Sequence, residues 1–337
     1  MHPEFVRGAF FLTHAAVDIR AKWPYNMKLK MKFNFEMENM MKRFLILLLA
    51  LLLFAGAAIA EERPSIVATS FPCYDFMRAV AGDAADVRLL IRPGTEVHTY
   101  EPTPKDILEI ADAELFVYIG GESDAWVDNL MKTFDENGPK TLKLMDSVSL
   151  LEEEDDHGHD ELEYDEHIWT SPKNALKMLQ SAADAICEVD PAHAEIYRKN
   201  AEEYESAIAE LDARLTEIVQ NGVRNEMIFA DRFPFLYLAH DYGLSYRAAF
   251  NSCTAESEPS AQKMVELIQA IENDHIPVIY TIEMSNGAIA RTLADETGAE
   301  ILNMHSMQTV TQVEFDAGET YITLMRKNLD AIERGLN

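Results

Sequence analysis

Residues 190–219 read DPAHAEIYRKNAEEYESAIAELDARLTEIV, and this stretch separates two halves of the chain that have similar patterns. Asp190 and Pro191 are residue types that precede and open helices. Between Pro191 and Val219 there is no Gly or Pro, and apolar residues recur at spacings of four and three. They are Tyr197, Ala201, Tyr204, Ile208, Leu211, Leu215 and Ile218. The pattern predicts one helix of about 29 residues, roughly 44 Å long, with a single apolar stripe.

A helix of this length can either join two lobes or pair with another helix in a coiled coil. The stripe extends over only about three heptads, which is short for a coiled coil. On both sides of it, strand-like and helix-like segments alternate, as in parallel sheets covered by helices. The strand-like segments are 65–70, 87–91, 115–119, 226–230, 278–281 and 300–303, and the helix-like ones are 74–81, 104–111, 125–133, 172–189, 235–242, 260–273 and 289–297.

The alternation predicts an α/β protein with two similar lobes, each a mostly parallel sheet flanked by helices, joined by one long rigid linker helix. We expect an N-terminal lobe over 61–189 that includes an acidic, His-containing loop over 152–166. The linker helix is expected over 190–220 and the C-terminal lobe over 221–337.

The longest apolar run, FLILLLALLLFAGAAIA at 44–60, lies outside this pattern. It follows Lys42-Arg43 and ends in Ala58-Ile59-Ala60, which is the arrangement of a secretory signal peptide with its cleavage site. We expect cleavage near Ala60 and a periplasmic or secreted protein. Because Met40 and Met41 stand where a signal peptide would begin, residues 1–60 are interpreted as a non-native extension plus the signal peptide.

The chain is strongly acidic, with 58 Asp and Glu against 29 Lys and Arg among 337 residues, a formal charge of −29. Without residues 1–60, which carry 8 basic and 4 acidic residues, the charge is −33. Such a charge repels phosphate backbones and anionic membrane surfaces, so nucleic acid is excluded as a partner and a cation is favoured.

The three cysteines are far apart and form no CxxC motif. A bound metal would therefore be held mainly by imidazole and carboxylate groups. Cys253 is interpreted as a buried or disulfide-bonded thiol rather than a ligand, and whether it pairs with Cys73 or Cys187 stays open.

Three histidines follow strand-like segments, where open α/β sheets bind their ligands. His98 lies in the segment RPGTEVHTYEPTP at 92–104, whose prolines give it the fixed backbone that a ligating imidazole needs. His167 follows Asp165-Glu166 and enters the apolar pair Ile168-Trp169. His305 follows the strand-like segment 300–303. Three neutral imidazoles suit a borderline cation such as Zn²⁺ better than Ca²⁺ or Mg²⁺.

The tract EEEDDHGHDE at 152–161 contains seven acidic residues and two histidines in ten positions. Such a charge run cannot pack into a core and is predicted to be a solvated loop. His157 and His159 are either simply solvated or provide secondary, weak capture of a divalent metal ion.

Taken in order, several motifs between Ser65 and the C-terminal region resemble the zinc and manganese substrate-binding proteins of bacterial ABC uptake transporters, the cluster A-I family. They are Ser70-Phe71-Pro72, Pro93-Gly94-x-x-x-His98-x-Tyr100-Glu101-Pro102-x-Pro104, the acidic loop before His167-Ile168-Trp169, the Asp190-Pro191 helix, Tyr242-Gly243-Leu244, Glu256-x-Glu258-Pro259-Ser260 and Thr297-Gly298-Ala299 before His305. The resemblance implies two lobes joined by a rigid helix, with the metal in the cleft between them.

The resemblance further implies that His98 and His167 are the two His ligands of the first lobe, and that His305 stands where many members have an Asp. The chain departs from the family at Arg232, where a His or Glu ligand is usual and where a guanidinium has no lone pair to offer. Asp231 is either a ligand after a one-residue shift or a carboxylate paired with Arg232. The acidic His loop and the excess of imidazoles favour zinc over manganese, which would favour two His and two carboxylates.

From the resemblance we expect a monomeric, non-enzymatic, extracytoplasmic zinc receptor that delivers the ion to an ABC transporter membrane permease. A manganese-specific receptor of the same family is one alternative. The other is a secreted zinc-dependent hydrolase, which would need an open metal position and a carboxylate base, and the sequence contains no HExxH-like spacing.

Overall fold

The computed structural model describes residues 25–55, 63–134, 138–153, 164–250 and 259–337. It contains two compact units, Met1–Glu62 and Arg63–Asn337. The described part of the first unit is one helix, α1 (Tyr25–Ala55), which contains the beginning of the predicted signal-peptide run. Among the described residues, no helix combines the length and apolar character that crossing a membrane requires.

The second unit begins with a four-stranded parallel sheet in the order β2-β1-β3-β4, where β1 is Ser65–Ala68, β2 Asp86–Leu89, β3 Leu115–Tyr118 and β4 Lys140–Lys143. Ile66 pairs with Val87 on one side and with Leu115 on the other. The central strands SIVA and LFVY are almost entirely buried, as expected where helices cover both faces. The helices of this lobe are α2 (Phe71–Ala81), α3 (Pro104–Ala111), α4 (Ala125–Met131) and α5 (Pro172–Val189), with short 3-10 turns at Glu122–Asp124, Leu144–Ser147 and Ile168–Thr170.

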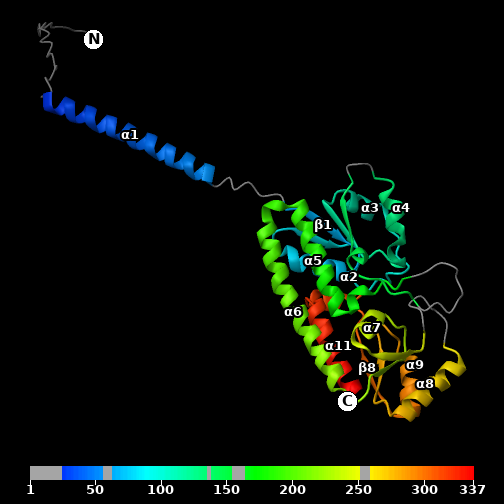
Figure 1. Cartoon of the computed structure of the whole chain (residues 1–337). Coiled ribbons are helices and arrows are strands. Elements are labelled where there is room, and N and C mark those ends of the chain that lie inside the picture. Colours follow the sequence, from blue (N-terminus) through cyan, green and yellow to red (C-terminus); the bar gives the residue numbers. More distant parts are fainter. Residues whose placement is uncertain (1–24, 56–62, 135–137, 154–163, 251–258) are drawn as a thin grey trace, which may run out of the picture. The chain divides into compact units, whose positions relative to one another are not determined.

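The second lobe repeats this topology with the order β6-β5-β7-β8, where β5 is Glu226–Phe229, β6 Ser245–Ala248, β7 Val278–Thr281 and β8 Glu300–Asn303. All its pairs are parallel, and Ile279 lies opposite both Ile228 and Ile301. Its helices are α7 (Leu236–Tyr242), α8 (Ala261–Asp274), α9 (Ala288–Thr297), α10 (Gln312–Asp316) and α11 (Tyr321–Leu336). The predicted fold of two similar α/β lobes is therefore confirmed (Figure 1).

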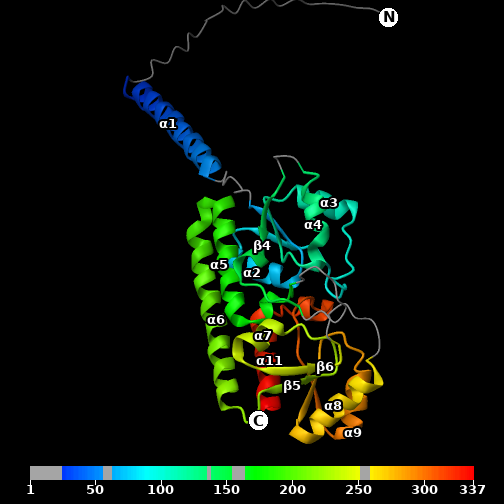
Figure 2. The same ribbon diagram turned by 45° about the vertical axis from the view of Figure 1, so that its right-hand side comes forward.

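The connector is α6 (Ala194–Asn221), which follows a 3-10 turn at Pro191–His193. Six of the seven predicted stripe residues are buried, and Tyr204 is partly buried. In both views α6 runs alongside α5 and α11, and it contacts α2 and α5 of the first lobe and α11 of the second (Figures 1 and 2). Asp190 does not cap the helix as expected, because its carboxylate accepts hydrogen bonds from the Tyr197 hydroxyl (2.6 Å) and from His193 Nδ1 (2.6 Å) instead.

One continuous apolar core joins the lobes. It includes Phe71 and Trp169 from the first lobe, the buried face of α6, and Phe229 and Tyr280 from the second lobe. Smaller clusters lie in the first lobe around Phe116 and in the second around Ile279. The shared core places the carboxyl ends of the central strands of both sheets next to the boundary between the lobes, where the candidate site lies.

Candidate metal centre

His98 lies in the segment between β2 and α3, which hydrogen bonds hold in place. The Tyr100 hydroxyl donates to Asp106 (2.9 Å), and Thr103 and Asp106 cap the start of α3 reciprocally. The backbone N–H of Gly94 donates to the carbonyl oxygen of Val310 in the second lobe (2.7 Å). The rigid setting predicted for His98 is therefore present, and its side chain is only 10% exposed.

His167 is buried just before the 3-10 turn Ile168–Thr170. Asp165 Oδ1 lies 3.2 Å from His167 Nδ1 and also accepts the backbone N–H of His167 (2.7 Å). Since an ionised carboxylate only accepts hydrogen bonds, the imidazole proton belongs on Nδ1. The lone pair of the neutral ring is then on Nε2, the nitrogen that can ligate a metal.

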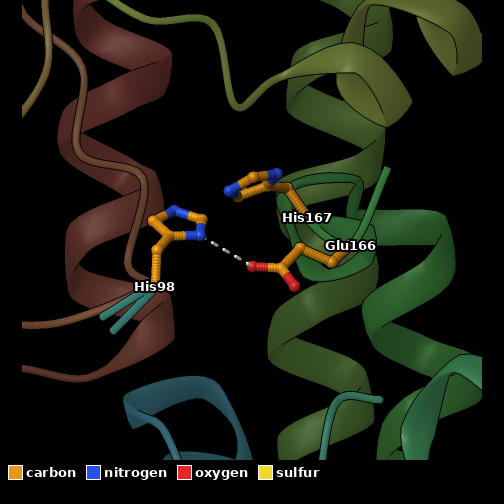
Figure 3. Close-up of side chains that lie close together, drawn as sticks. All are labelled: His98, Glu166 and His167. Atoms are coloured by element: carbon orange, nitrogen blue, oxygen red, sulfur yellow. Dashed lines mark ion pairs between the residues drawn. The ribbon is translucent and has the colours of Figure 1, made fainter. Parts of the chain in front are cut away.

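Glu166 completes a group that the sequence analysis did not identify. One ligand atom each from His98, Glu166 and His167 lie within 4.8 Å of one another, and Figure 3 shows the two rings and the carboxylate close together. Glu166 Oε1 is 3.5 Å from His98 Nδ1, and the centroids of the two imidazole rings are 6.0 Å apart. The only sequence signal for Glu166 was its place in the acidic pair before His167. This signal is weak, because the side chains of neighbouring residues often point in different directions.

His305 is buried but is not part of this group of described residues. Its Nδ1 accepts a hydrogen bond from the backbone N–H of Met307 (2.9 Å), so a neutral ring carries its proton on Nε2. That nitrogen lies 3.6 Å from Glu314 Oε1. His305 therefore carries its proton on Nε2, whereas His167 carries it on Nδ1. To ligate a metal through Nε2, as predicted, His305 would have to move its proton to Nδ1 and give up the hydrogen bond from Met307.

Asp231 follows β5 and is also not in the group of described residues around His98. Its Oδ1 accepts the backbone N–H of Arg232 (3.0 Å). The Arg232 guanidinium lies 3.7 Å from Glu96 Oε2 of the first lobe. The pairing of Asp231 with Arg232 stays a prediction. Asp231 as a ligand stays a prediction.

The remaining candidates are only partly described. His157, His159 and Cys253 lie outside the described residues. Cys73 and Cys187 are both free and buried, so these two thiols do not pair with each other. Burial raises the pKa of the Cys73 thiol to about 12, which keeps it protonated at neutral pH.

A cavity of about 40 Å³ lies between the lobes. Its lining consists of Glu96, Val97, His98 and His167 from the first lobe and Arg232, Pro234, Ile282, Glu283, Met284, Ser306, Gln308 and Thr309 from the second. A water molecule needs roughly 10–15 Å³, so the cavity has room for an ion with a few waters.

The electrostatics of His98 favour metal binding. Burial lowers its pKa, the negative charge of Glu166 partly opposes this, and His167 and Arg232 lower it further. An imidazole must be neutral to ligate a metal, so a lowered pKa keeps His98 competent into mildly acidic solution.

Two similar α/β lobes joined by one long helix, with buried imidazoles around a small cavity between them, define a two-lobed substrate-binding protein of the metal-binding class. Residues 66–335 match the family model described as zinc-uptake complex component A, periplasmic. The chain belongs to this family.

Two relatives show the extent of the similarity. The chain is 36% identical over 283 residues to the zinc-binding lipoprotein AdcA of Streptococcus pneumoniae, covering 82% of this chain but 56% of AdcA. It thus spans little more than half the length of AdcA. It is 34% identical over 283 residues to the high-affinity zinc uptake system protein ZnuA of Bacillus subtilis, covering 82% of this chain and 88% of that protein.

Solved structures agree with this assignment. The Zn(II)-bound ZnuA-like domain of Streptococcus pneumoniae AdcA has a TM-score of 0.71 at 34% identity, with 81% of this chain and 99% of that domain covered. The metal-dependent lipoprotein YcdH of Bacillus subtilis has a TM-score of 0.72 at 31% identity, with 82% of this chain and 100% of YcdH covered.

Proposed function

We propose that this protein is an extracytoplasmic receptor that binds Zn²⁺ in the cleft between its lobes and delivers it to the membrane permease of an ABC transporter. The observation that carries the proposal is the pair His98, which is partly buried, and His167, which is buried, two imidazoles from separate segments that line one ion-sized cavity. The zinc-binding and zinc-uptake relatives AdcA and ZnuA support zinc as the cargo.

In this proposal His98 and His167 supply the two nitrogen ligands. Zinc in proteins is usually four-coordinate, so two positions remain for oxygen or further nitrogen donors. The carboxylates of Glu96 and Glu283 line the cavity, and water can also enter it. His305 and Asp231 remain candidates that would have to leave their present hydrogen-bond partners.

Manganese is a second candidate cargo because carboxylates are plentiful at the site. Glu96 and Glu283 line the cavity and Glu166 lies beside His98, and Mn²⁺ favours oxygen donors more than Zn²⁺ does. Competition titrations with both ions decide between them, and tighter binding of Mn²⁺ would refute the zinc assignment. A hydrolase is disfavoured because the sequence contains no HExxH-like spacing and the relatives AdcA and ZnuA are zinc-binding and zinc-uptake proteins.

We further propose that the run 44–60 directs export and is cleaved near Ala60. Mass spectrometry of the protein recovered from the extracytoplasmic fraction of expressing cells measures this. A mature N-terminus within a few residues of position 61 is expected, and retention of residues 44–60 would contradict the proposal.

The main test is zinc affinity measured by competition with a chromophoric chelator. His98→Ala and His167→Ala should each weaken binding about hundredfold, because each removes one of the two proposed nitrogen ligands. His305→Ala should have a smaller effect, since its Nε2 faces Glu314. The matched control is His240→Ala, whose side chain is 61% exposed. Unchanged affinity in either of the first two variants would overturn the site.

A further inference from the structure

Ser123 connects Glu166 to His98. It lies in the turn Glu122–Asp124 after β3 and is buried. Its hydroxyl oxygen is 2.9 Å from His98 Nδ1 and forms a short hydrogen bond with Glu166 Oε1. Its backbone N–H donates to Glu166 Oε2 (2.8 Å). One serine therefore contacts both an imidazole of the proposed zinc site and the carboxylate beside it.

The donors around Glu166 determine the direction of the hydrogen bonds that Ser123 forms. Three donors converge on Glu166, namely the N–H and O–H of Ser123 and the side-chain amide of Gln308 (3.1 Å), as expected for an ionised carboxylate. The Ser123 hydroxyl has a single proton, and Glu166 receives it. Towards His98 the hydroxyl can then only accept, so His98 must carry its proton on Nδ1.

Resting on the zinc-binding function proposed above, we infer that Ser123 and Glu166 are positioning residues that hold His98 with its proton on Nδ1 and its lone pair on Nε2. Asp165 has the same effect on His167 directly, through Nδ1. Both proposed ligands are thus prepared before the ion arrives. In this assignment Glu166 acts through Ser123 and does not itself ligate the metal.

The local backbone supports this arrangement. A Cβ atom added at Gly121, just before the turn that carries Ser123, would overlap the Glu166 side chain, so only glycine leaves space for that carboxylate. The side-chain amide of Gln308, in the second lobe, donates to Glu166 Oε1. This hydrogen bond links Glu166 and Ser123 to the opposite wall of the cleft.

Nitrogen-15 NMR of the metal-free protein tests the inference directly, at a pH where the ring is neutral. The His98 signals are assigned by their absence in His98→Ala. The wild-type protein should show protonated Nδ1 and unprotonated Nε2 for His98. In Ser123→Ala this preference should weaken, because the nearest remaining acceptor for Nδ1 is Glu166 Oε1 at 3.5 Å. Zinc affinity should fall about 10–100-fold, the usual effect of removing a group that orients a metal ligand.

Two further variants and a control sharpen the test. Glu166→Gln should move the His98 proton to Nε2, because a side-chain amide at the Oε1 position donates to the Ser123 hydroxyl and turns its proton towards Nδ1. Ser123→Thr keeps the hydroxyl and should restore the Nδ1 proton. Ser147→Ala, which removes a hydroxyl bonded to a backbone carbonyl elsewhere in the lobe, should change neither readout.

The inference is overturned if wild-type His98 carries its proton on Nε2, if Glu166→Gln leaves the proton on Nδ1, or if Ser123→Ala changes neither the proton preference nor the zinc affinity. Loss of affinity in Glu166→Gln without movement of the proton would also overturn it, since Glu166 would then be a direct ligand. If the proton behaves as expected but the wild-type protein does not bind zinc, the proposed function fails while the positioning role stands.

Discussion

Asp124 shows at the residue scale how the burial around the metal centre affects stability. It directly follows Ser123, and its Oδ2 accepts the backbone N–H groups of Ile119 (2.7 Å) and Gly120 (3.1 Å). Burial raises the pKa of its carboxyl to about 7, helped by the negative charge of Glu166 and opposed by the two backbone N–H groups. The protein therefore contains an acid that titrates near neutral pH in the folded state and near pH 4 when unfolded.

This difference predicts a pH-dependent stability. Between about pH 4 and pH 7 the folded state holds a proton that the unfolded state has released, so stability falls as pH rises through this window. Asp124→Asn removes the effect and keeps an oxygen that can accept the two N–H groups. Relative to wild type, the metal-free variant should gain about 2.6 kcal/mol in unfolding free energy between pH 5 and pH 8.

Urea denaturation at both pH values measures this change, with the exposed Asp128→Asn as the control. A difference between variant and wild type that stays the same at the two pH values would show that Asp124 is ionised throughout.

At the scale of elements, Asp75 of α2 connects three helices. Its Oδ1 pairs with Arg78 of the same helix (2.7 Å to Nη2), while its Oδ2 accepts the Tyr204 hydroxyl of α6 and the first backbone N–H of α11, at Tyr321 (2.9 Å). A negative charge at the start of α11 also interacts favourably with the helix dipole. Asp75 thus joins a first-lobe helix, the connector and the last helix of the second lobe.

Asp75→Ala should destabilise the protein by about 2–4 kcal/mol, because it leaves Arg78, a buried hydroxyl and the N–H of Tyr321 without their acceptor. Asp75→Asn keeps one acceptor oxygen and should cost less. Chemical denaturation measures the effect against the control Asp83→Ala, whose side chain is exposed. If Asp75→Ala and Asp83→Ala unfold at the same denaturant concentration, the connection is not important for stability.

At the scale of the whole molecule, the two lobes are joined by direct contacts as well as by α6. Trp169 Nε1 donates to the carbonyl oxygen of Ser306 (2.7 Å), and the Tyr237 hydroxyl donates to that of Asp165 (2.8 Å). Together with the shared core, these bonds flank the cavity on the sides of His167 and Ser306. The arrangement favours small relative tilts of the lobes over wide hinge opening.

A single core predicts a single unfolding transition for residues 63–337. Calorimetry should give one peak with equal calorimetric and van't Hoff enthalpies. Free Zn²⁺ at a hundred times its dissociation constant should stabilise the protein by about 2.7 kcal/mol, and a chelator should reverse the shift. Two separate transitions, or a zinc shift confined to one of them, would show that the lobes unfold independently.

The sequence predicted the central strands and most helices, but it missed β4, β6, α10 and α11. The strands β4 (KTLK) and β6 (SYRA) lie at sheet edges, and they are short and polar enough to lack an apolar run. In α11 the buried residues do follow a helical period, from Tyr321 and Leu324 to Leu329 and Ile332, so a signal was present there.

The sequence by itself determined the two lobes, the connector and the two histidines that the structure brings together. Their signals, the apolar periodicity of helices and strands and the prolines beside His98, are local, because each depends only on residues close together in the sequence. Only the tertiary structure decided which groups surround those histidines. Ser123 meets Glu166 across 43 positions of sequence, and Gln308 meets it across 142. The position of a proton on His98 depends on such contacts, which exist only after both lobes have folded onto their common core.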